Sequence, residues 1–229
     1  MKKRKDNRRL DEMRKIEAKV GVIKRANGSA MFRIGDTIAV VAVYGPRSLH
    51  PKYLQDPERG ILRVYYNMMA FSGSGERIRP GPSRRSREVS MVIEKALTSV
   101  LDLKEFPGGV VDVFIEIIQS DSGTRCAGIC AASLAIADAG FKMKDLISAV
   151  ALGRIDNDIY VDVTKDEEDI EGMADVPVAY LPSSGKIVLL QCDGFLKKEQ
   201  LKEILKIGKK VCLEIYKVQQ KALKEGYKK

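Results

Sequence analysis

The stretch VVDVFIEIIQSDSGTRCAGICAASLAIADAG, residues 110–140, predicts a strand, a tight turn and a helix in succession. Residues 110–119 are rich in valine and isoleucine, which favour strands. Serine, aspartate and glycine at positions 120–123 are typical of a turn. Small apolar residues then continue as a helix until Gly140, because glycine commonly ends helices. This unit indicates an α/β protein.

A second strand–loop–helix unit precedes this one. Residues 61–69 predict a strand, and a Gly- and Ser-rich loop follows it. Apolar residues between Val89 and Leu101 then recur at the i, i+3, i+4 spacing of an amphipathic helix. Upstream of both units, apolar patterning predicts an antiparallel meander over residues 16–23, 30–34 and 37–44, which Gly45-Pro46 is expected to end.

The second half of the chain predicts two hairpins and a long helix. These elements are expected at residues 148–154 with 159–163, around a turn at 182–185, and over 201–222, with an acidic loop at 165–173. No repeat or flexible linker divides the chain. We therefore expect a basic N-terminal arm, residues 1–14, and one α/β domain of mixed sheets with packed helices, residues 15–229.

The charge balance favours a polyanionic partner. The 229 residues include 40 lysines and arginines against 31 aspartates and glutamates, a formal charge of +9 at pH 7 that suits nucleic acid phosphates. The four cysteines lack C-x-x-C spacing and His50 is the one histidine, so the sequence indicates neither a zinc site nor a disulfide framework. No apolar run suggests a signal peptide or a membrane span, so we expect a cytoplasmic protein.

Ser122-Gly123-Thr124-Arg125 has the composition of a phosphate cradle. Glycine lets the backbone approach an anion, and the first N–H groups of a helix point at it. Thr124 would add a hydroxyl group and Arg125 a fork of donors. An ordinary turn with a helix cap has the same composition, so this motif alone leaves both interpretations open.

Arg84 and Arg85 lie at or just before the first turn of an expected helix. Cations at a helix N-terminus oppose the helix dipole by roughly 0.3 to 1 kcal/mol. An anion between these arginines and the helix amides would remove that cost, which favours a phosphate site. A solvated helix start is the alternative interpretation.

Asp175 precedes an apolar strand, where an unpaired carboxylate would be costly. If Asp169 lies beside it, a divalent cation such as Mg²⁺ or Mn²⁺ between the two would offset their repulsion. The neighbouring acidic residues are more simply interpreted as a solvated charge run: Asp166, Glu167 and Glu168.

Taken in order along the chain, these motifs resemble the ribonuclease PH family. The resemblance covers about residues 8 to 227 and rests on the segments Arg63-Val64-Tyr65-Tyr66-Asn67-Met68, Phe71-Ser72, Ser83-Arg84-Arg85-Ser86, Gln119 through Arg125, Ala132 through Gly140, and Glu168-Asp169 with Ala174-Asp175-Val176-Pro177. Within the family, the catalytic ring subunits of archaeal exosomes are the most similar. The resemblance implies the ribonuclease PH fold, an α+β arrangement like domain 2 of ribosomal protein S5.

The resemblance also implies an activity and a set of roles. It implies processive 3′-to-5′ phosphorolysis of single-stranded RNA, which releases nucleoside diphosphates and should reverse to 3′ tail synthesis when diphosphates are abundant. In the family, positions matched by Gly123, Thr124 and Arg125 hold inorganic phosphate, those matched by Arg84 and Arg85 contact the RNA 3′ end and phosphate, and those matched by Asp169 and Asp175 serve the metal and the leaving group. We expect Asp175 to protonate or position the leaving 3′ oxygen and Asp169 to bind the metal, with the two roles exchangeable.

The same resemblance implies partners. It implies a hexameric ring of three heterodimers with an inactive sister subunit, capped by proteins that carry S1 or KH RNA-binding domains. Inactive sister subunits commonly lack the acidic pair and parts of the phosphate motif, and both are present here, so we expect the active partner. A basic loop is expected to grip the incoming RNA by charge and stacking, through Arg47, His50, Lys52 and Arg59.

One departure from the family pattern lies near the start of the chain, where Asp6-Asn7-Arg8 replaces the frequent D-G-R. It bears on the contacts of the arm rather than on the active site. Two other functions stay open at this point. The chain could be a non-catalytic RNA-binding ring subunit, or a free-standing ribonuclease PH that trims the 3′ ends of transfer RNA.

Overall fold

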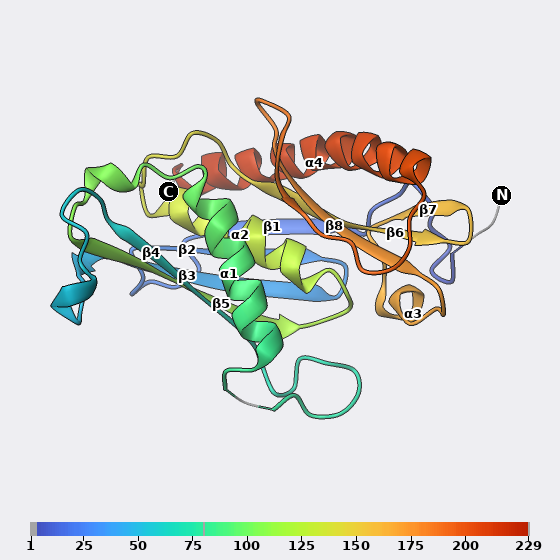
Figure 1. The fold of residues 1–229 in the computed structure, drawn as a ribbon, viewed down its shortest axis with the longest axis horizontal. Helices are drawn as coiled ribbons and strands as arrows, with labels where there is room; N and C mark the ends of the chain where they lie inside the picture. Colours follow the sequence, from blue (N-terminus) through green and yellow to red (C-terminus); the bar gives the residue numbers. More distant parts are fainter. Residues whose placement is uncertain (1–3, 80, 229) are drawn as a thin grey trace.

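The computed structural model describes residues 4–79 and 81–228, which form two β-sheets and the helices that cover them (Figure 1). The first sheet contains β1 (Ile16–Val20), β2 (Gly28–Ile34), β3 (Thr37–Ser48), β4 (Ile61–Met68) and β5 (Gly109–Gln119). Their order is β1-β2-β3-β5-β4. Only β4 and β5 pair in parallel, because a helix crosses over between them, and the sheet is therefore mixed.

The second sheet is antiparallel, with the order β7-β6-β8-β9. Its strands are β6 (Ser148–Ile155), β7 (Asp158–Val161), β8 (Ala174–Leu181) and β9 (Lys186–Leu190). The α-helices are α1 (Arg84–Thr98), α2 (Thr124–Asp138), the single turn α3 (Lys165–Glu168) and α4 (Lys198–Gly226), with short 3-10 turns η1 (Lys52–Leu54) and η2 (Leu103–Glu105). In Figure 1, α4 runs along the second sheet. No described helix has the length and apolar character needed to cross a membrane.

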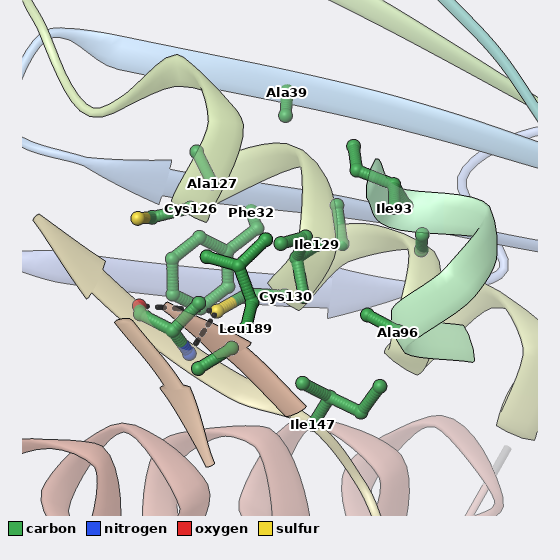
Figure 2. Packing of buried hydrophobic residues seen from close by; sticks show 14 of the residues in the cluster. Phe32, Ala39, Ile93, Ala96, Cys126, Ala127, Ile129, Cys130, Ile147 and Leu189 are labelled. Carbon is green, nitrogen blue, oxygen red and sulfur yellow. Dashed lines mark hydrogen bonds between the residues drawn. The ribbon is translucent and has the colours of Figure 1, made fainter. Parts of the chain in front are cut away.

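Helix α2 forms the centre of the core. It packs on β2 and β3 of the first sheet and on β6 of the second, and nearly all of its residues are buried. Figure 2 shows Ile129 and Cys130 of this helix beside Phe32 of β2. The backbone N–H of Ala149 in β6 donates a hydrogen bond to Cys130 Sγ at 3.2 Å. Burial raises the pKa of Cys130 to about 12, so this thiol is a packing residue.

The N-terminal arm packs on the body of the protein through a buried arginine. Arg4 donates to both carboxylate oxygens of Glu167, at 2.6 and 2.5 Å, and to the carbonyl oxygens of Val161 and Asp162, at 2.6 and 2.7 Å. The prediction of a solvated charge run is therefore wrong for Glu167, because Arg4 compensates the buried carboxylate. Residues 1–3 of the expected arm lie outside the described residues.

Asn7 adopts a left-handed backbone conformation, with φ of 66°. Asparagine tolerates this region better than most residues other than glycine. The replacement of glycine in the D-G-R pattern is thus compatible with the turn, and Arg8 still reaches Asp162 Oδ2 at 3.3 Å.

Strand β3 does not end at Gly45-Pro46, contrary to the sequence prediction. The strand continues to Ser48, and its register against β5 shifts between Tyr44 and Arg47. Proline lacks the N–H that a regular ladder uses, and an irregularity of this kind accommodates it. The exposed loop is correspondingly shorter and contains η1, and the predicted acidic loop begins with the turn α3.

The start of β2 lies against the end of α2 with no room for a side chain. A methyl group on Gly28 would lie 2.2 Å from the backbone nitrogen of Ala139 and 2.4 Å from the carbonyl oxygen of Ala135.

We expect Gly28→Ala to lower the free energy of unfolding by about 3 kcal/mol, because the helix backbone must move. Urea denaturation measures the change. Gly75→Ala, with nothing within 4 Å, should stay within about 0.5 kcal/mol of the parent, and equal losses in the two variants would contradict the packing argument.

Candidate active site

A cavity of about 330 Å³ opens where the first turns of α1 and α2 meet the second sheet. Residues from six segments of the chain surround it, and most of their side chains are polar or charged. The lining residues are Arg85, Glu88, Ser122, Gly123, Thr124, Arg125, Cys126, Ala151, Glu168, Asp175, Pro177, Gln191, Cys192 and Asp193. The structure therefore brings the predicted phosphate cradle, one predicted arginine and one predicted aspartate into a single site.

The turn before α2, residues 120–123, presents backbone to this cavity. Ser122 and Gly123 both have left-handed backbone conformations, with φ of 58° and 64°. Gly123 is the N-cap of α2, and no side-chain hydrogen bond caps the first turn. The positive end of the helix dipole and its first amides thus remain available to an anion, as the cradle interpretation requires.

Arg125 contacts Glu88 at the cavity, and Gln191 in turn contacts Glu88, two side chains that the sequence did not single out. Its Nη2 lies 3.5 Å from Oε2 of Glu88, on the next turn of α1 after Arg85. The other carboxylate oxygen of Glu88 accepts a hydrogen bond of 2.9 Å from Gln191 Nε2. Glu88 and Gln191 lie 37 and 66 residues from Arg125 along the chain, so no local motif could have revealed them.

Asp175 is the carboxylic acid of the cavity whose environment shifts its pKa. Its Oδ1 atom is buried and has no hydrogen-bond partner among the residues that the structure describes. Burial, helped by the nearby carboxylates of Glu168 and Asp193, raises the pKa of Asp175 to about 6, although the positive charge of Arg125 acts to lower it. This carboxyl group is therefore prepared to hold a proton or to meet a cation.

Asp169 is placed differently from the sequence prediction that pairs it with Asp175. Its exposed carboxylate, directly after α3, forms an ion pair with Lys165, the first residue of that helix, and Glu168, not Asp169, lines the cavity. Interpreting Glu168 as only solvated charge was wrong for this reason. Among residues 4–79 and 81–228, no group of three or more acidic, histidine or cysteine side chains is arranged to hold a metal ion. The unpaired oxygen of Asp175 fits one ligand position, and Asp169 would have to leave Lys165 to supply a second.

The predicted RNA-contacting residues are not gathered at the cavity. Arg85 lines it, whereas Arg84 is exposed beside it on α1. The basic loop around η1 lies far from α3 along the long axis of the molecule (Figure 1). Arg47 pairs there with the buried Asp112, at 2.5 Å, and Arg59 pairs with Asp56, at 2.8 Å. His50 and Lys52 of the same loop are exposed.

The raised pKa of Asp175 predicts a pH-dependent stability. Its folded-state value of about 6 lies above the ordinary value of 3.8, so ionisation destabilises the folded protein above pH 6, and this cost disappears as the pH falls toward 4. We expect Asp175→Asn to raise the free energy of unfolding at pH 8 by on the order of 2 kcal/mol, with little gain at pH 4. Denaturant titrations at the two pH values measure the difference.

Asp11→Asn provides the control for this experiment, because its parent carboxylate is exposed at 66%. It should change stability little at either pH. A gain for Asp175→Asn that is the same at pH 4 and pH 8 would show that the carboxyl group does not carry the perturbed ionisation.

The sequence is similar to those of known proteins. Exosome complex component Rrp41 of Thermococcus gammatolerans is 53% identical over 224 residues, which cover 98% of this chain and 89% of that protein. The protein of the same name from Nitrosopumilus maritimus is 47% identical over 225 residues, covering 98% and 91%.

Two solved structures share the fold. The crystal structure of rice Rrp46 superposes with a TM-score of 0.86 at 22% identity, covering 96% of this chain and 100% of that one. The Archaeoglobus fulgidus exosome with RNA bound to the active site gives a TM-score of 0.79 at 24% identity, covering 93% and 91%.

Family profiles match both halves of the chain. Domain 1 of the 3′ exoribonuclease family matches residues 12–142, and domain 2 matches residues 145–211. Together with the identity to the archaeal relatives, these matches confirm the resemblance first seen in the motifs. The chain belongs to the ribonuclease PH family of 3′ exoribonucleases.

Proposed function

We propose that this chain is the catalytic subunit of an archaeal exosome, a 3′-to-5′ exoribonuclease that degrades single-stranded RNA by phosphorolysis. The observation that carries the proposal is one cavity in which an anion-binding helix start faces a buried acid, through Arg125 and Asp175. Phosphorolysis needs both, because a phosphate ion must be held and an alkoxide must leave. The relatives named as exosome components support the assignment.

Inorganic phosphate is the nucleophile in this reaction. The amides around Gly123, the hydroxyl of Thr124 and the guanidinium of Arg125 would bind it. One phosphate oxygen attacks the phosphorus of the last phosphodiester, and the bond from that phosphorus to the 3′ oxygen of the preceding nucleotide breaks. The products are a nucleoside diphosphate and an RNA shortened by one nucleotide, without a covalent enzyme intermediate.

Arg85 and Arg125 would stabilise the negative charge that develops on the transferring group. Both line the cavity, from the first turns of α1 and α2. Their positive charge would offset the cost of bringing phosphate close to an RNA phosphodiester. This requirement explains why arginines occupy helix starts, where the dipole alone disfavours them.

Asp175 is the proposed acid for the leaving 3′ oxygen. With a pKa of about 6, roughly a tenth of this side chain is protonated at pH 7, and that form can donate to the alkoxide. In its ionised form Asp175 would instead be a metal ligand, with Asp169 as the second proposed ligand for Mg²⁺ or Mn²⁺, which supplies positive charge beside the leaving oxygen when bound. Asp193 and Glu168 act on this group through its pKa.

The basic loop would act on RNA away from the reacting bond. Because the segment around η1 lies far from α3 (Figure 1), we propose that Arg47, His50, Lys52 and Arg59 contact nucleotides upstream of the 3′ end or RNA bound at a neighbouring subunit. The partners that we propose are an inactive sister subunit in a hexameric ring of three heterodimers and S1- or KH-domain cap proteins, in the cytoplasm. At high nucleoside diphosphate the same site would add 3′ tails.

The product distinguishes phosphorolysis from other functions. We expect the chain, assembled with its sister subunit, to release nucleoside diphosphates from a 3′-extended single-stranded RNA only when phosphate is present. Arg125→Lys keeps the charge but loses the fork of donors, so its KM for phosphate should rise about tenfold or more. Arg9→Lys, on the exposed arm, is the matched control.

Other products would overturn this proposal. Nucleoside monophosphates released without phosphate would establish hydrolysis. The absence of product in the assembled complex would indicate a non-catalytic RNA-binding subunit. Full activity of the chain alone as a homohexamer, measured by native mass, would indicate a free-standing ribonuclease PH.

Removal of the acid tests the role of Asp175. We expect Asp175→Asn to lower kcat by about 10²- to 10⁴-fold, because the alkoxide loses its proton donor or, where Asp175 is ionised, the cation loses a ligand. RNA affinity in the absence of phosphate should change little. Since the same variant is expected to be more stable at neutral pH, lost activity could not be assigned to unfolding. If Asp175→Asn were as active as Asp11→Asn, Asp175 would be excluded as the acid.

A further inference from the structure

The phosphate-binding turn has a conformation that its own residues do not favour. Ser122 is buried, is not glycine, and has φ of 58°, and Gly123 continues in the left-handed region at 64°. A left-handed conformation costs a non-glycine residue on the order of 1 kcal/mol. Contacts from elsewhere in the fold must therefore hold this turn in place.

Thr37, the first residue of β3, holds the turn from one side. Its side chain is fully buried. Its Oγ1 donates a hydrogen bond of 2.6 Å to the carbonyl oxygen of Ser122 and accepts one of 2.9 Å from the backbone N–H of Asp121. One hydroxyl group thus fixes two peptide groups of the turn, the one before Asp121 and the one after Ser122, although Thr37 is not part of the cavity lining.

Arg14, at the end of the N-terminal arm, holds the same turn from another direction. Its Nη1 donates to the carbonyl oxygen and to Oδ2 of Asp121, both at 2.7 Å. Its Nε and Nη2 donate to the two carboxylate oxygens of the buried Asp162, at 2.8 and 2.7 Å. The guanidinium group therefore ties the turn to the second sheet, and it also lies outside the cavity lining.

Asp121 extends this connection to α3. Its Oδ1 accepts a hydrogen bond of 2.9 Å from the backbone N–H of Lys165, the first residue of α3. The next residues of α3 lead to Glu168 at the cavity. The turn that would bind phosphate and the segment that carries the acidic residues are thus fixed to each other through one carboxylate.

We propose that Thr37 and Arg14 are positioning residues for phosphate, which they affect through the shape of the 120–125 turn and never touch. The identity of the anion rests on the proposed function. A turn held in its binding conformation before phosphate arrives avoids the cost of ordering it on binding. Loss of either contact should therefore weaken phosphate binding and leave RNA binding unchanged.

Thr37→Val is the sharpest test, because valine has nearly the shape of threonine and lacks the hydroxyl group. Two buried hydrogen bonds are lost, so the affinity for phosphate should fall about tenfold. The experiment uses the full chain in complex with its sister subunit. It measures binding of inorganic phosphate by isothermal titration calorimetry, KM for phosphate and kcat by diphosphate release, and the Kd of single-stranded RNA without phosphate.

Two controls separate positioning from general destabilisation. Thr37→Ser restores the hydroxyl group and should recover most of the phosphate affinity. Thr98→Val makes the same chemical change on an exposed surface of α1 and should behave like the parent. Arg14→Lys keeps the charge but cannot bridge Asp121 and Asp162 in the same way, and should raise the KM for phosphate in the same direction as Thr37→Val.

The outcomes distinguish this proposal from the proposed function. A higher KM for phosphate in Thr37→Val, with kcat and RNA affinity kept, would support positioning. An unchanged KM, or an equal loss of phosphate and RNA binding, would overturn it. If the parent protein binds phosphate but releases no diphosphate, the proposed function fails, and the calorimetric comparison of Thr37→Val with Thr37→Ser still decides the positioning role.

Discussion

The close packing of α2 between the two sheets is the constraint on which the other features depend. Helix α2 has mostly small side chains, so β2 and β6 can both pack closely against it. At Gly28 the backbone of the helix fills the space that a side chain would need. Burial of this helix also decides where its N-terminus points. Since the cavity forms around that N-terminus, the hydrophobic core sets the position of the proposed anion site.

Buried ion pairs add to the apolar core in holding distant segments of the chain together. The N-terminal arm contributes Arg4 and Arg14, and each meets a carboxylate in the second half of the chain, Glu167 or Asp162. A buried ion pair is costly to form and more costly to break from one side only. These pairs therefore fix the relative position of segments more than 140 residues apart and connect the start of the chain to the cavity.

Local patterns in the sequence predicted most of the fold. Apolar alternation located the strands of both sheets, helical periodicity located α1 and α4, and the strand–turn–helix unit of residues 110–140 appears as β5 and α2. The errors occurred where a distant contact decides the outcome. Glu167 is buried only because Arg4 reaches it, and β3 passes Gly45-Pro46 because β5 continues to pair with it. For the site, composition identified the turn, Arg125 and Asp175, but Glu88 and Gln191 become visible only when three separate segments meet.

The four cysteines differ sharply in accessibility, and this difference has a practical consequence. Burial raises the pKa of all four thiols, but Cys126, Cys130 and Cys212 are buried, whereas Cys192 is exposed at the cavity. Thiolate formation and access together govern modification by alkylating reagents. The native chain therefore carries one accessible thiol beside the proposed reaction centre. A fluorophore attached there would report on occupancy of the cavity without any engineered cysteine.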